Sequence, residues 1–196
     1  MSVGKVLLTL VIAFVVGVLI VGGCVYSGYN KAVSLDESVN SGWAEIDNQL
    51  QRRFDLVSNL VETVKGVAAQ EEKIFLGVAE ARKAYFQTDS RAEKARAAGM
   101  LESALSRLLV LRETYPELKS NESFLKLQDS LEGTENRVAV ARKHYNDAVE
   151  SLNRFSRKLL GGFYASLAGV EKAEYFRVEE AAKATPKVDF SEGGDG

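Results

Sequence analysis

The residues from Val6 to Val25 form an unbroken apolar run, and this run constrains the fold more than any other feature. It reads VLLTLVIAFVVGVLIVGGCV, with one hydroxyl side chain and no charged residue. A helix of about 20 apolar residues spans the hydrocarbon core of a bilayer, so the run predicts a membrane anchor. The predicted membrane-anchor residues are Val6, Leu7, Leu8, Leu10, Val11, Ile12, Phe14, Val15, Val16, Val18, Leu19 and Ile20.

The end of the run carries Cys24, the only cysteine of the chain, and allows two interpretations. The stretch Val21-Gly22-Gly23-Cys24 resembles a bacterial lipobox, in which the cysteine is lipidated and the preceding signal is removed. The length of the run favours a retained signal anchor, because cleaved signals have shorter apolar cores. Both interpretations stay open, as does a packing role for Cys24 as a small apolar residue.

The positive charges around the run predict its orientation. Lys5 precedes the run and Lys31 follows it, which weakly favours a cytoplasmic N-terminus and an exported domain. The reversed orientation stays open, because a single lysine carries this prediction.

We expect an anchor over residues 1–26, a helical domain over 27–185 and a tail over 186–196 that is disordered at its end.

Composition limits the function of the remainder. The 25 Lys and Arg residues are balanced by 27 Asp and Glu residues, whereas a nucleic-acid-binding face needs a basic excess. The chain has only two prolines, which favours long helices. One cysteine excludes an internal disulfide and a cysteine-based metal cluster.

A long helix is predicted after Ser34, which has capping-box spacing with Glu37. The sequence does not decide whether this helix continues the apolar run or is separated from it by a break near residues 28–34. Gly66 and the polar run Gln70-Glu71-Glu72-Lys73 predict a turn or a kink before a second helix. The apolar positions follow each other at steps of three or four and form one stripe: Val39, Trp43, Ile46, Leu50, Phe54, Val57, Val61 and Val64, flanked by Leu60.

Three more long helices complete the predicted fold. The second ends near Phe86, and the third starts at a capping box of Ser90 and Glu93 and ends before Pro116. The fourth has a heptad-like stripe over 124–155, typical of coiled-coil-like bundle packing. We therefore expect an all-α, up-and-down antiparallel bundle of about four long helices, followed by a short polar helix over 171–184.

These segments resemble the bacterial LemA family. The first long helix carries Trp43-Ala-Glu-Ile-Asp47-Asn-Gln-Leu50-Gln-Arg52-Arg53-Phe-Asp55-Leu-Val-Ser-Asn59-Leu60-Val61 and then Val64-Lys65-Gly66. A second block has Tyr115-Pro116, then Leu131-Glu132-Gly133-Thr134-Glu135-Asn136-Arg137, then Ala141-Arg142. The resemblance covers nearly the whole chain. Two departures are Ser58, where the family often has proline, and Gln70-Glu71, where it often has His-Glu.

The resemblance implies a membrane-anchored helical bundle in the bacterial cytoplasmic, or inner, membrane. It implies little chemistry, because the family has no accepted enzymatic activity and its members are envelope proteins, with relatives linked to membrane organisation. The composition supports the same expectation. His144 is the only histidine, so no catalytic dyad or histidine-rich metal site can be built. We expect neither an enzyme nor a cofactor, metal or small-molecule substrate.

The polar residues of the two motif blocks have a structural interpretation. Charges beside a bundle seam can fix the register of helices through complementary pairs, and we expect such pairs between helices or subunits. The candidate residues are Asp47, Arg52, Arg53, Asp55, Asn59, Glu132, Glu135, Asn136, Arg137 and Arg142.

The apolar segment around Phe163, Tyr164 and Leu167 has two interpretations. It either caps the apolar end of the bundle or touches the membrane interface, because the fourth helix returns towards the bilayer. For the whole chain the main hypothesis is a self-associating scaffold that contacts membrane lipid and organises the envelope. The alternative is a sensor or adaptor for another envelope membrane protein, such as a protease or signalling protein.

Overall fold

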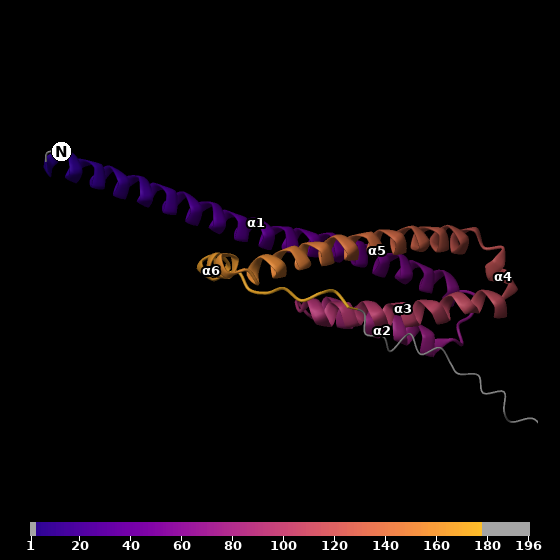
Figure 1. Ribbon diagram of the computed structural model, residues 1–196. Coiled ribbons are helices and arrows are strands. Elements are labelled where there is room, and N and C mark those ends of the chain that lie inside the picture. Colours follow the sequence, from indigo (N-terminus) through magenta and orange to yellow (C-terminus); the bar gives the residue numbers. More distant parts are fainter. Residues whose placement is uncertain (1–2, 178–196) are drawn as a thin grey trace, which may run out of the picture. The chain divides into compact units, whose positions relative to one another are not determined.

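The computed structural model describes residues 3–177, and the ordered elements over this range are helices (Figure 1). The predicted tail over 186–196, residues 178–184 of the predicted polar helix and the side chain of Val6 lie outside the described residues. The helices are α1 (Val3–Lys65), α2 (Glu72–Phe86), α3 (Arg91–Thr114), α4 (Pro116–Lys119), α5 (Glu122–Ser156) and α6 (Leu159–Leu167). The chain is thus all-helical, with a long apolar N-terminal helix that packs against further helices in an antiparallel bundle, as predicted.

Helix α1 runs without a break from Val3 to Lys65. The long helix therefore continues the apolar run, and there is no break near residues 28–34. Ser34 therefore does not cap a helix, although its spacing to Glu37 fits a capping box. Instead the Ser38 hydroxyl donates to the Ser34 carbonyl within the helix, at 2.8 Å. A capping box needs a non-helical residue at its first position, and here the preceding turns are already helical.

The chain forms two compact units, and both contain parts of α1 and α5. The first unit consists of Met1–Gln49 and Asn136–Tyr175, and the second is built around Leu50–Glu135. The predicted stripe of α1 forms core in both units, with Trp43 half-buried and the rest buried.

In the second unit, the end of α1, then α2, α3 and the start of α5 alternate in direction (Figure 1). The connections follow local sequence signals. Ser90 caps α3 by accepting from the Glu93 amide, as predicted, and Asn121 accepts from the Phe124 amide at the start of α5. Pro116 opens the single turn α4, where its missing N–H has no cost.

In the first unit, α1 and α5 lie close together at Gly42. A Cβ added there would lie 3.1 Å from the Tyr145 Cα, so any larger residue requires the two helices to move apart by a few tenths of an ångström. The ring of Trp43 meets the Tyr145 ring edge-on, with 5.7 Å between centroids. The tryptophan that opens the family motif thus packs against the seam of α5.

The predicted helix over 171–184 is wrong for its described part, because residues 171–177 form no helix. The segment is bound to α5 instead. The Asn153 amide donates to the Ala173 carbonyl at 2.8 Å and its oxygen accepts from the Ala173 N–H at 3.1 Å, while the Tyr145 hydroxyl donates to the Glu174 carbonyl at 2.8 Å. These side chains satisfy backbone groups that a helix would otherwise pair.

Candidate functional site

Arg53 is the central charged residue of the second unit, because only 3% of its surface is exposed. Its Nη2 lies 2.8 Å from Glu102 Oε2 of α3 and 3.6 Å from Glu135 Oε2 of α5. A buried guanidinium is tolerated when carboxylates pair with it, and both partners here reach solvent. Of the predicted polar residues, the structure therefore brings together Arg53 and Glu135, and it adds Glu102.

Asp55 forms a second link, from α1 to α2. Arg82 Nη1 lies 3.1 Å from Asp55 Oδ1 and donates to the Ser58 hydroxyl at 3.0 Å. The same guanidinium lies over the Phe86 ring, 5.1 Å from its centroid. Ser58, a departure from the family pattern, thus contributes an acceptor that a proline would lack.

The other motif residues are placed differently. Asp47 and Arg142 are half-buried, and both have interaction partners. The remaining predicted residues lie on the solvent-exposed surface of α1 and α5: Arg52, Asn59, Glu132, Asn136 and Arg137. Because these five side chains face solvent, a buried seam does not include them.

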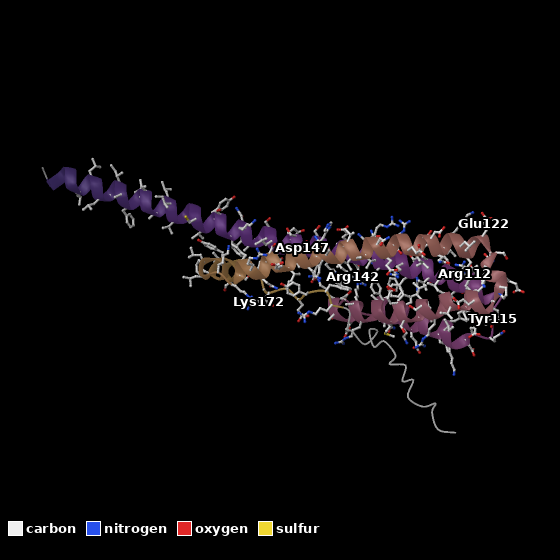
Figure 2. All side chains as sticks on the ribbon, turned by 45° about the vertical axis from the view of Figure 1, so that its right-hand side comes forward. Arg112, Tyr115, Glu122, Arg142, Asp147 and Lys172 are labelled. Atoms are coloured by element: carbon white, nitrogen blue, oxygen red, sulfur yellow. The ribbon has the colours of Figure 1, made fainter. Side chains whose placement is uncertain are left out.

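A hydrogen-bonded cluster at Tyr115 joins the connection between α1 and α2 to the C-terminal end of α3. Tyr115 is labelled in Figure 2. The Tyr115 hydroxyl donates to Glu71 Oε1 at 3.0 Å and accepts from Gln70 Nε2 at 2.7 Å. Desolvation raises the pKa of Tyr115 above its usual value, and the nearby Glu71 carboxylate raises it further, while the Gln70 hydrogen bond opposes them. Gln70 and Glu71 are the second departure from the family pattern, and they form this cluster.

His144 lies on an open groove between α1 and α5 of the first unit. Its Nδ1 is 3.9 Å from Glu45 Oε2, and both side chains are largely exposed, as predicted for the lone histidine. Small residues line the groove, among them Ser38, Ser41 and Gly42. Within residues 3–177, no group of three or more His, Cys, Asp or Glu side chains is arranged to hold a metal ion.

The apolar segment of α1 is exposed at every described residue from Leu7 to Cys24. α1 is long and apolar enough to cross a membrane, and none of its apolar window is buried. Figure 2 shows the side chains of this segment projecting outward along the helix. Phe14 is 73% exposed, and the Cys24 thiol is free and exposed. The other described anchor residues from Leu7 to Ile20 are exposed as well.

Helix α6 packs against α1 just beyond this apolar segment. The Tyr164 ring lies against Gly28 so closely that an added Cβ would be 2.2 Å from Tyr164 Cδ2. Phe163 and Leu167, the other two candidates for membrane contact, are more than half exposed. The close contact at Gly28 was not predicted, because a glycine next to an apolar run has no distinctive pattern.

Together these features define the class: an all-helical bundle protein with an apolar N-terminal helix of membrane-spanning length. Residues 42–190 match the sequence profile of the LemA family, and the chain belongs to this family.

Three relatives share 27% identity with this chain, over 82% of its length and 68% of theirs. They are magnetosome proteins MamQ 1 and MamQ 2 of Paramagnetospirillum magneticum and magnetosome protein MamQ of Magnetospirillum gryphiswaldense.

Proposed function

We propose that this protein is a non-enzymatic, membrane-anchored helical scaffold of the bacterial envelope. One observation carries the proposal: the exposed apolar segment and the bundle share the single uninterrupted helix α1. A flexible linker would let a tethered domain move freely, whereas a continuous helix holds the first unit at a fixed distance from the bilayer. Such a connection suits a protein that presents a rigid surface at the membrane.

The proposed role is to organise the membrane or envelope through self-association. Ala13 and Gly17 give the apolar segment a small-residue face, on which two spans can approach each other. An added Cβ at Gly17 would meet no atom of residues 3–177 within 4 Å, so the described part of the chain does not cover this face. The similarity to magnetosome proteins is compatible with a role of this kind.

The proposed location is the cytoplasmic membrane, with a single pass and the bundle outside the cytoplasm. Alkaline carbonate extraction of membranes tests the anchor, because an integral protein stays in the pellet. Protease added to intact spheroplasts tests the orientation, because an exported bundle is digested while an internal one is protected. Release of the chain by carbonate would contradict the anchor.

The mass of the purified chain decides between the two interpretations of the N-terminus. An intact Met1 supports the retained anchor. A chain that starts at Cys24 with added acyl mass supports a lipoprotein, which contradicts the proposal that α1 spans the bilayer.

A further inference from the structure

Helix α6 has its large apolar side chains on the outside. Gly161 and Ala165 are its buried residues, whereas Leu159 is 92% exposed and Phe163 58% exposed. A helix in a soluble bundle has the opposite arrangement, with large apolar residues inward. The outer face of α6 is therefore apolar and has no partner among residues 3–177 that buries it.

The contact between Tyr164 and Gly28 fixes the position of α6 along α1. Gly28 follows Val25, the last residue of the apolar run, by three residues, which is about 4.5 Å of helix. The headgroup layer on each side of the hydrocarbon core is about 5–7 Å thick. A residue packed on Gly28 thus lies at the level of the headgroups when the run fills the core.

The ends of α6 are as expected for a helix at a membrane surface. The helix itself contains no charged residue, and exposed Arg157 and Lys158 directly precede it. Basic side chains next to an apolar helix favour binding to anionic headgroups. Gly169, with φ of 66°, ends the helix, and the Val170 amide donates to the Ala165 carbonyl at 2.9 Å, so the end is well defined.

We propose that α6 lies in the membrane interface and binds lipid through Leu159, Leu160, Phe163 and Leu167. This inference rests on the proposed anchoring of α1, because the apolar run places Gly28 at the surface. Together α1 and α6 contact the bilayer at two points, which fixes the tilt of the first unit as well as its distance. Lipid is the occupant that the position favours, since the exposed face begins where the span ends.

The test uses depth-dependent fluorescence in the full-length chain. The native chain has one tryptophan, Trp43, which is 18 residues beyond Val25 and hence about 27 Å along α1 from the run. A second tryptophan is introduced by F163W on α6, by F14W in the middle of the run, or by V140W on α5. Val140 serves as the matched control, because it is 51% exposed, similar to Phe163, and belongs to the same unit. It lies on α5, 15 residues before Phe155 near the end of that helix, and is therefore far along the chain from α6.

Each variant is reconstituted into vesicles of phosphatidylcholine and phosphatidylglycerol, with or without bromine on the acyl chains. We expect brominated lipid to quench the added fluorescence of F163W and F14W, and to leave that of V140W and of the native chain unchanged. Circular dichroism confirms that each variant is folded.

The outcomes separate the inference from the proposal on which it rests. Quenching of F14W without quenching of F163W overturns the interfacial position of α6 and leaves the anchor intact. A blue-shifted but unquenched F163W spectrum indicates that a second copy covers α6, and this also overturns the inference. Absence of quenching in F14W contradicts the anchor itself, and quenching of V140W contradicts the specific role of α6.

Discussion

Arg53 Nη2 lies 2.8 Å from Glu102 Oε2, and this ion pair joins α1 to α3 at a position where the arginine is almost fully buried. The second carboxylate, Glu135, is farther from the guanidinium and more exposed. Glu102 is therefore the main carboxylate that compensates the buried charge of Arg53.

Loss of Glu102 should destabilise the bundle more than loss of Glu135. We expect E102A to lower the free energy of unfolding by about 1–3 kcal/mol, because it leaves a buried cation underpaired. The expected cost of E135A is below about 1 kcal/mol, as for an exposed pair. Urea unfolding of the full-length chain in detergent, followed by circular dichroism, measures both.

The variant R53M serves as the control for this pair. It removes the buried charge and retains apolar bulk, so it should cost less than E102A. If E135A is the most damaging of the three variants, the assignment of Glu102 as the main partner is wrong.

Substitution of Gly42 should separate α1 from α5 in the first unit. Because an added Cβ alone would lie 3.1 Å from the Tyr145 Cα, the larger leucine side chain overpacks this site. We expect G42L to lower the free energy of unfolding by about 1–3 kcal/mol. The neighbouring Ser41 is exposed, and S41L is the matched control with an expected cost near zero. Equal melting temperatures of G42L and S41L would contradict the close approach.

The contact between Gly28 and Tyr164 predicts that G28A releases α6. The added methyl group overlaps the ring, so Tyr164 must move away. Hydrogen exchange of the α6 amides should become faster in G28A and stay unchanged in G23A, because a Cβ at Gly23 meets nothing within 4 Å. Unchanged exchange in both variants would show that α6 is held by other contacts.

The raised pKa of Tyr115 predicts a loss of stability at alkaline pH. The folded state favours the neutral phenol, so this contribution is complete below the unfolded pKa of about 10 and is lost as the pH rises through the folded pKa. Y115F removes the ionisable hydroxyl, and its stability should fall less steeply above pH about 10. Parallel pH profiles for the two proteins would exclude this contribution.

Much of the fold is predictable from the sequence because its signals are local and periodic. The α5 seam over Phe124–Phe155 is buried or half-buried at every predicted position, and Ser90 caps α3 as its spacing to Glu93 indicates. Ser34 has the same spacing to Glu37 but lies within α1, since helix formation is cooperative and continues through a capping signal. Local spacing alone does not show whether the preceding residues are helical.

The contacts between distant residues were less predictable. Arg53 and Glu135 were both candidates from the motifs, but Glu102 is one of many glutamates and nothing in its spacing marks it as the nearer partner. The helix predicted from Glu171 fails over 171–177 because Asn153, 20 residues earlier, binds both backbone groups of Ala173. A tertiary contact of this kind overrides local helix propensity.

The central claim, a self-associating scaffold held at the membrane by α1, is tested most directly by the mass of the full-length protein extracted into lipid nanodiscs. The chain has a mass of 21.4 kDa. We predict one homogeneous assembly that contains two or more copies, so that its protein mass is a whole-number multiple of this value. A single chain that co-purifies in fixed ratio with another membrane protein would contradict the scaffold and support an adaptor.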